Sequence, residues 1–148
     1  MTVSSLSNLA NVDVSSFKDT TNNTDTITNV ATTTLSSEEY VKRYFSDTPI
    51  LAEVAKCESQ FRQYDKYGGV LRGDDNVYDI GIMQINELYH RQLAKKLGLD
   101  INNISGNVAY ARDLFEREGL RPWIASSKCW SKTQAYRNYK MSDSLAMK

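Results

Sequence analysis

The chain has few of the residues that build metal centres. Its 148 residues include one histidine and two cysteines, Cys57 and Cys129, and these three match no zinc-ligand spacing. We therefore expect no metal site. We expect the two cysteines to form a disulfide, and the alternative is that both stay reduced and buried. A bond between them would close a loop of about 70 residues and would contribute roughly 4 kcal/mol by restricting the unfolded chain.

Net charge and long apolar runs are also lacking. Lys plus Arg number 18, as do Asp plus Glu, so the formal net charge is zero. A nucleic-acid binder would normally carry a basic face, and we expect no nucleic-acid partner. No apolar stretch approaches the roughly 20 residues that span a bilayer. The N-terminus shows no basic start followed by an apolar stretch, so the sequence displays no signal peptide.

Composition divides the chain into three parts. Residues 1–35 are rich in Ser, Thr and Asn and show no sustained apolar period. Such a segment cannot offset the entropy lost on ordering, which favours a flexible tail or linker over an irregular arm lying on the domain. Residues 36–132 hold the periodic apolar pattern of a folded domain, and residues 133–148 are expected to form a C-terminal tail of weak periodicity.

Capping and stop signals predict several helices. Ser36 and Glu39 fit a capping box, and Thr48 before Pro49 fits the start of a second helix. Gly98 and Gly119 fit helix ends. Together with apolar periodicity, these signals predict helices over residues 36–45, 48–63, 86–98, 104–118 and 122–130. Residues 67–76 read as turns and a small β-hairpin. The expected fold class is mainly α, with a small β-hairpin or irregular element.

Glu58 is anomalous because it occupies the apolar stripe of the predicted helix 48–63. A carboxylate held there loses hydration, which raises its pKa. A carboxylic acid that stays protonated near neutral pH can donate a proton to a glycosidic oxygen. The alternative is a glutamate at the edge of the stripe that pairs with Arg62, one turn further on.

The segment 79–86, Asp-Ile-Gly-Ile-Met-Gln-Ile-Asn, is a second unusual feature. Gly81 permits an unusual backbone conformation or a close ligand approach. Gln84 sits between apolar neighbours, where a buried amide needs partners or faces a cleft. Amides suit carbohydrate because they both donate to and accept from hydroxyl groups. The alternative is a strand with one polar edge residue.

Three blocks together resemble a known family. Residues 57–61 (CESQF), 79–86 (DIGIMQIN) and 103–111 (NISGNVAYA) occur in the order and approximate spacing of the soluble lytic transglycosylase catalytic domain, within the lysozyme-like superfamily. The resemblance covers about residues 48–130. It implies a lysozyme-like helical domain with a small β-hairpin beside an active-site cleft between two lobes, no cofactor, and cleavage of peptidoglycan.

The resemblance also implies roles for individual residues. Glu58 would be the catalytic acid and then the base. The expected substrate-binding residues are Ser59 (which would also orient Glu58), Gly81, Met83, Gln84, Tyr110 and Trp123. The family's Ala-Tyr-Asn-Ala-Gly segment is replaced here by residues 121–130. In that segment Trp123 is either a platform that stacks on sugar or a core tryptophan.

Asp79 leaves two reactions open. A lytic transglycosylase needs no second carboxylate, because the 6-hydroxyl of N-acetylmuramic acid closes an anhydro ring. A hydrolytic muramidase would use Glu58 and Asp79 together. The third reading is a non-catalytic glycan-binding envelope module of the same fold. We expect a monomer outside the cytoplasm, either secreted, in the cell envelope or delivered by a phage. His90, Arg112 and Arg117 are expected on the solvated surface.

Overall fold

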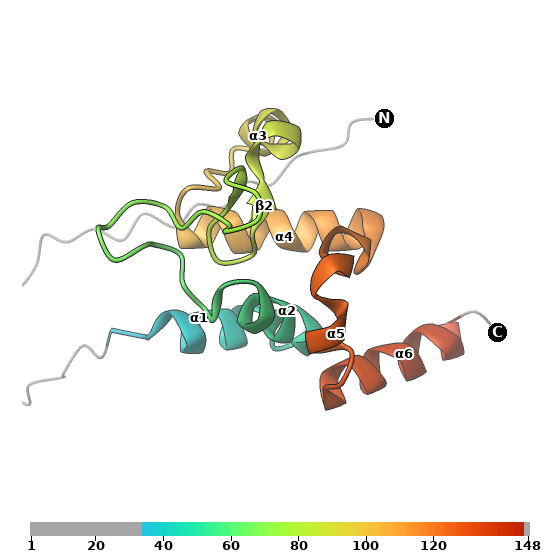
Figure 1. Ribbon diagram of the computed structural model, residues 1–148. Coiled ribbons are helices and arrows are strands. Elements are labelled where there is room, and N and C mark those ends of the chain that lie inside the picture. Colours follow the sequence, from blue (N-terminus) through green and yellow to red (C-terminus); the bar gives the residue numbers. More distant parts are fainter. Residues whose placement is uncertain (1–33, 147–148) are drawn as a thin grey trace, which may run out of the picture. The chain divides into compact units, whose positions relative to one another are not determined.

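The computed structural model describes residues 34–146, and the predicted tail of residues 1–35 lies almost entirely outside them. Helices dominate, with one two-stranded antiparallel sheet (Figure 1), which confirms the predicted mainly α class. No helix among these residues is long and apolar enough to cross a membrane. The elements are α1 (Ser37–Tyr44), α2 (Pro49–Ser59), β1 (Asp79–Ile80), β2 (Ile85–Asn86), α3 (Glu87–Lys96), α4 (Ile104–Glu118), the 3-10 helix η1 (Arg121–Ser126), α5 (Ser127–Trp130) and α6 (Gln134–Ala146).

Helix α1 begins at the predicted capping box. The Ser36 hydroxyl accepts from the Glu39 backbone N–H at 3.2 Å, and the Glu39 carboxylate accepts from the Ser36 backbone N–H at 2.9 Å. This exchange provides partners for two N–H groups that the first turn of a helix leaves without one. Helix α2 begins at Pro49, as predicted, because proline has no N–H to leave unpaired there.

Helix α2 ends four residues earlier than predicted, at Ser59 instead of Gln63. Gln60 and Phe61 adopt left-handed backbone conformations, with φ of 55° and 61°, and these turn the chain away. The turn places Gln63 beneath the sheet, where its side chain is 2 % exposed. Its amide accepts from the Ile82 N–H at 2.9 Å and donates to the Asn102 carbonyl at 3.0 Å. The early end thus brings a buried amide to the strand connection.

The small sheet pairs Asp79 with Asn86 and Ile80 with Ile85. Its connecting turn is held by Asn107 of α4, which is fully buried. The Asn107 amide accepts from the Met83 N–H at 2.9 Å and donates to the Ile80 carbonyl at 3.1 Å. Buried backbone groups need such partners, so the Asn107 side chain stabilises this turn. The two-stranded hairpin lies at 79–86, after the predicted 67–76 region. That region holds turns and takes part in two isolated antiparallel bridges, Tyr64–Val70 and Arg72–Ile80.

The hydrophobic core surrounds α2, which contacts α1, η1, α5 and α6. Leu51, Val54 and Ala55 of α2 are fully buried, as their helical spacing predicted. A disulfide joins Cys57 of α2 to Cys129 of α5, with a Cα–Cα distance of 6.0 Å. The expected disulfide is therefore confirmed.

Residues 134–146 correct the expectation of a weakly structured C-terminal tail, because they form helix α6. Its packing rests on three residues at helical spacing, Ala135, Tyr136 and Tyr139, which contact the core. The Tyr139 ring lies 5.7 Å from that of Phe115, and the Tyr136 ring 5.2 Å from that of Trp130. The short stripe is mainly tyrosine, so it gave a weak apolar period in the sequence although it packs well.

Candidate active site

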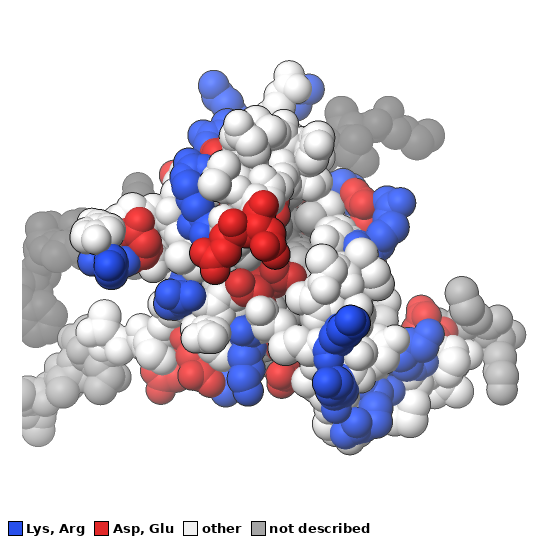
Figure 2. Space-filling model, in the orientation of Figure 1, with Lys and Arg blue, Asp and Glu red and all other residues white. Residues whose placement is uncertain are grey.

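A cleft of about 280 Å³ brings together residues from α2, the sheet, α3, α4 and η1. Figure 2 shows acidic side chains gathered in the middle of one face of the molecule, below the part that contains α3. Three carboxylates line the cleft: Glu58, Asp79 and Glu118. The other residues that line it are Gln84, Ile85, Asn86, Tyr89, His90, Leu114, Pro122, Trp123 and Ala125.

Glu58 lies in the last turn of α2 and is half-buried. Burial raises the pKa of its carboxyl group, the negative charge of Asp79 adds to the rise, and a hydrogen bond from Ser126 opposes it. The predicted direction is therefore confirmed, and its main cause is the predicted loss of hydration. The alternative pairing with Arg62 is absent, because the Arg62 Nε donates to the Ser59 carbonyl at 3.0 Å.

Asp79 reaches the same cleft from β1. Its Oδ1 accepts from the Asn86 side-chain amide at 2.7 Å, across the pair of residues that face each other in the sheet. Asn86 also caps α3, since its side chain accepts from the Leu88 N–H at 3.1 Å. One asparagine thus fixes both the second carboxylate and the start of the helix that forms a cleft wall.

Gln84 and Trp123 border the cleft, as the resemblance implied. Gln84 has a φ of 48°, and its amide donates to the Gly81 carbonyl at 2.8 Å. Trp123 is only 3 % exposed, and its indole N–H donates to the Met83 carbonyl at 2.9 Å. Between the two readings of Trp123, its burial favours the core tryptophan. So little of the ring is exposed that it offers no open face for stacking on a sugar.

Four of the residues predicted to bind substrate do not line the cleft: Ser59, Gly81, Met83 and Tyr110. The Ser59 side chain is 2 % exposed and donates to the Ile82 carbonyl at 2.7 Å, so it supports the strand connection and not Glu58. Met83 and Tyr110 are fully buried. Gly81 has a φ of 73°, and a Cβ there would lie 2.5 Å from the Asn107 amide nitrogen. The close approach at Gly81 is therefore made by a protein side chain.

His90 lies in the cleft wall, half-buried, and not on the solvated surface as predicted. Its Nδ1 is 2.9 Å from the Tyr110 hydroxyl, which in turn accepts from Arg117 at 3.4 Å. Burial is the main cause that lowers the pKa of His90. Its place on a polar helix face gave no signal of this position in the sequence.

Arg112 was predicted to lie on the solvated surface, but its side chain makes several contacts within the protein. Its guanidinium donates to the Asp47 carboxylate at 2.8 Å and to the Tyr44 carbonyl at 2.9 Å. It also lies over the rings of Tyr44 and Phe45. Arg112 therefore joins α4 to the end of α1.

Ser126 was not predicted, yet its hydroxyl makes the one side-chain hydrogen bond to Glu58 among the described residues. Its Oγ is 2.6 Å from the Glu58 Oε1, and it accepts from the Trp130 indole N–H at 3.1 Å. Ser126 belongs to residues 121–130, where the sequence departs from the family that it resembles. The disulfide at Cys129, three residues further on, ties this segment to the residue directly before Glu58.

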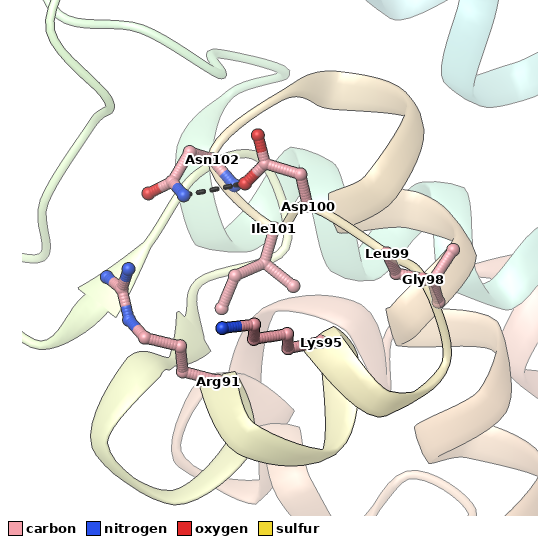
Figure 3. Close-up of a pocket in the computed structure, with 7 residues that line it drawn as sticks. All are labelled: Arg91, Lys95, Gly98, Leu99, Asp100, Ile101 and Asn102. Atoms are coloured by element: carbon pink, nitrogen blue, oxygen red, sulfur yellow. Dashed lines mark hydrogen bonds between the residues drawn. The ribbon is translucent and has the colours of Figure 1, made fainter.

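A larger hollow, of about 460 Å³, lies beside α3 (Figure 3) and is lined by Arg91, Lys95 and the connection 98–102. Asp100 is the one carboxylate that lines it. Hydrogen bonds from the backbone and then the side chain of Asn102 lower the pKa of Asp100, so this carboxyl is ionised near neutral pH. The hollow therefore offers no proton donor comparable with Glu58, and we place the candidate site in the smaller cleft.

Within residues 34–146, no group of three His, Cys, Asp or Glu side chains is placed to hold a metal ion. The chain matches no known family, no curated protein and no solved structure in comparisons with them. The chemistry of the cleft must therefore be argued from its own residues.

Proposed function

We propose that this protein cleaves the β-1,4 bond between N-acetylmuramic acid and N-acetylglucosamine in peptidoglycan, with Glu58 as the general acid and then the base. The observation that carries the proposal is a half-buried carboxyl group whose pKa is raised, in a cleft lined by a second carboxylate and by amides. Such a group is still protonated where an ordinary glutamate is ionised. Two of the three sequence blocks that resemble lytic transglycosylases contribute to this cleft: the first provides Glu58, and the second provides Asp79 and Gln84.

The reaction uses Glu58 twice. In the first step its protonated carboxyl donates to the glycosidic oxygen, the bond from that oxygen to the muramyl anomeric carbon breaks, and Glu58 becomes a carboxylate. In the second step the carboxylate takes a proton from the muramyl 6-hydroxyl, whose oxygen bonds to the anomeric carbon. The products are an anhydro-muramyl end and a free N-acetylglucosamine end. Proton transfer is balanced, so Glu58 returns to its initial state.

Hydrolysis is the second candidate, and the position of Asp79 favours it. Asp79 lines the same cleft and acts on the Glu58 carboxyl electrostatically, so it can stabilise positive charge at the anomeric carbon. Against hydrolysis, Asp79 already accepts a hydrogen bond from Asn86 and has a structural duty in the sheet. We therefore favour the transglycosylase reaction, in which Asp79 needs no covalent role.

A non-catalytic glycan-binding module of the same fold is the third candidate. A binding cleft would gain nothing from a half-buried acid that has no ion pair among the described residues, since its desolvation is unfavourable. Desolvation of this kind is typical of catalytic groups. The substrate and the disulfide both fit an extracytoplasmic site of action, because disulfides persist in oxidising compartments.

Mass spectrometry of the soluble products from purified cell walls tests the proposal. We expect muropeptides with anhydro ends, which are lighter by one water than those with reducing ends. Reducing ends would instead assign the hydrolytic reaction. Wall binding with no soluble product at any enzyme concentration would contradict both reactions and support the binding module. Glu53→Gln is the matched control for Glu58→Gln, because Glu53 lies on α2 but does not line the cleft.

A further inference from the structure

The surroundings of the Ser126 hydroxyl carry an inference about how Glu58 changes its protonation state. Three groups lie within hydrogen-bond distance of the Ser126 Oγ. Glu58 Oε1 is at 2.6 Å, the Trp123 carbonyl oxygen at 3.1 Å and the Trp130 indole nitrogen at 3.1 Å. The indole can only donate, the carbonyl can only accept, and the carboxyl group does either, depending on its proton.

A serine hydroxyl has one hydrogen and two lone pairs. When Glu58 is a carboxylate, the hydroxyl hydrogen points to Glu58, and Trp130 donates to one lone pair. When Glu58 is protonated, its own O–H donates to the second lone pair, and the serine hydrogen turns to the Trp123 carbonyl. In both protonation states of Glu58 every donor has an acceptor, so no polar group of this half-buried site is left without a hydrogen bond.

Resting on the function proposed above, we propose that Ser126 is a positioning residue whose hydroxyl reorients each time Glu58 gives up or takes up its proton. To react, the Glu58 O–H turns from Ser126 to the glycosidic oxygen, which breaks its hydrogen bond to the serine. Donation then leaves a carboxylate, and the Ser126 hydrogen turns from Trp123 to Glu58. Recovery of a proton by Glu58 turns it back. The proton that reacts belongs to Glu58 and the substrate throughout, and the serine keeps its own.

The segment that carries Ser126 is well fixed for this purpose. Trp123 and Trp130, which provide its two other partners, are each 3 % exposed. The Trp130 indole also donates to the Trp123 carbonyl at 3.1 Å. The disulfide at Cys129 then joins the segment to α2. The hydroxyl oxygen therefore stays in place while only its hydrogen moves, which needs little reorganisation of the surroundings.

The first test measures the pKa of Glu58 by NMR of the ¹³C-labelled side-chain carboxyl, assigned by its loss in Glu58→Gln. The Ser126 hydroxyl stabilises the carboxylate, so Ser126→Ala should raise the pKa of Glu58 further. Ser126→Thr keeps a hydroxyl and should restore the parent value. Ser127→Ala, a neighbouring serine without a side-chain hydrogen bond among the described residues, should leave it unchanged. An unmoved or lowered pKa in Ser126→Ala would overturn the proposal.

The second test follows the rate of wall lysis against pH. The acid step needs protonated Glu58, so activity falls above its pKa, and Ser126→Ala should move that alkaline limb to higher pH. We expect kcat to drop by up to about a hundredfold, the scale of a misplaced catalytic group, with KM unchanged. A Ser126→Ala protein with the parent's kcat and pH limb would refute the role of Ser126 alone. A parent protein without any lysis would overturn the function proposed above, while the NMR result would still decide the hydrogen bond.

Ser126→Ala should fold, because the Trp130 indole retains the Trp123 carbonyl as an acceptor. Near-ultraviolet circular dichroism of both tryptophans checks this directly. If the alanine variant does not fold, Ser126→Thr decides instead: a threonine whose methyl group fits should keep the parent pKa and pH limb. A folded threonine variant in which the pKa of Glu58 and the alkaline limb of the pH–rate profile both differ from the parent's would contradict the proposal.

Discussion

Replacing Glu58 by glutamine separates its chemical role from its structural one. The amide has nearly the size of the carboxyl group. Its carbonyl oxygen can still accept a hydrogen bond from the Ser126 hydroxyl, whose Oγ lies 2.6 Å from the Glu58 Oε1 in the parent protein. What the variant loses is the proton that the acid step transfers. General acid–base groups typically contribute about a hundredfold or more to the rate. We therefore expect wall lysis to fall at least about a hundredfold, or roughly 2.7 kcal/mol of barrier.

The same substitution should change stability in a pH-dependent way. In the unfolded chain Glu58 titrates near the ordinary value of about 4.3, and in the folded protein its pKa is raised. Below the unfolded pKa both states are protonated, so burial brings no penalty. As pH rises through the window between the two pKa values, the parent loses stability, by about 1.4 kcal/mol for each unit that separates them. Water in the open cleft limits the separation.

Glutamine does not titrate, so Glu58→Gln escapes this loss. The melting temperature of the variant should match or exceed the parent's at pH 7, and the difference should shrink as the pH is lowered to 4. Calorimetry at several pH values measures this difference in melting temperature. Glu53→Gln is the control variant, whose lysis should be unchanged. A glutamine variant with near-normal lysis, or one whose advantage grows on acidification, would refute the reasoning.

Three further outcomes are expected. Asp79→Asn should keep lysis within about tenfold and retain anhydro products; a loss of several kcal/mol of barrier together with reducing ends would assign hydrolysis instead. Reduction of the Cys57–Cys129 disulfide should lower both the melting temperature and the lysis rate. If the melting temperature falls but the lysis rate does not, the bond has no role in maintaining the cleft. Gly81→Ala should destabilise the fold by about 1–3 kcal/mol in urea unfolding, since φ is 73° and the Asn107 amide fills the Cβ position; an unchanged midpoint would count against it.

The sequence was most informative where the physical cause is local. The capping box at Ser36, the proline start of α2 and the misplaced polarity of Glu58 each depend on residues within about one helical turn. These signals sufficed to predict most helices and the direction in which the pKa of Glu58 departs from its ordinary value. The early end of α2 was missed because Gln60 and Phe61 are not glycines and gave no stop signal.

Contacts between distant residues could not be predicted in the same way. Ser126 reaches Glu58 across 68 residues, and His90 reaches Tyr110 across 20. A serine and a histidine on polar segments look like ordinary surface until the fold places them. The resemblance to a family marked residues 59, 81, 83 and 110, which here support the strand connection and the core. Residues in these sequence blocks can therefore be needed for folding as well as for contact with substrate.

The disulfide makes the chain between its ends a covalent ring. The sequence separation of Cys57 and Cys129 is 72, so the ring includes the sheet, α3, α4 and the loop with the 84 % exposed Tyr67. A protease that cuts this loop once would leave Glu58 on one fragment and Asp79 on the other. Both fragments would remain one molecule, with the Glu58 turn still bonded to the segment of Ser126. A single cut in this exposed loop would therefore not separate the two halves of the cleft.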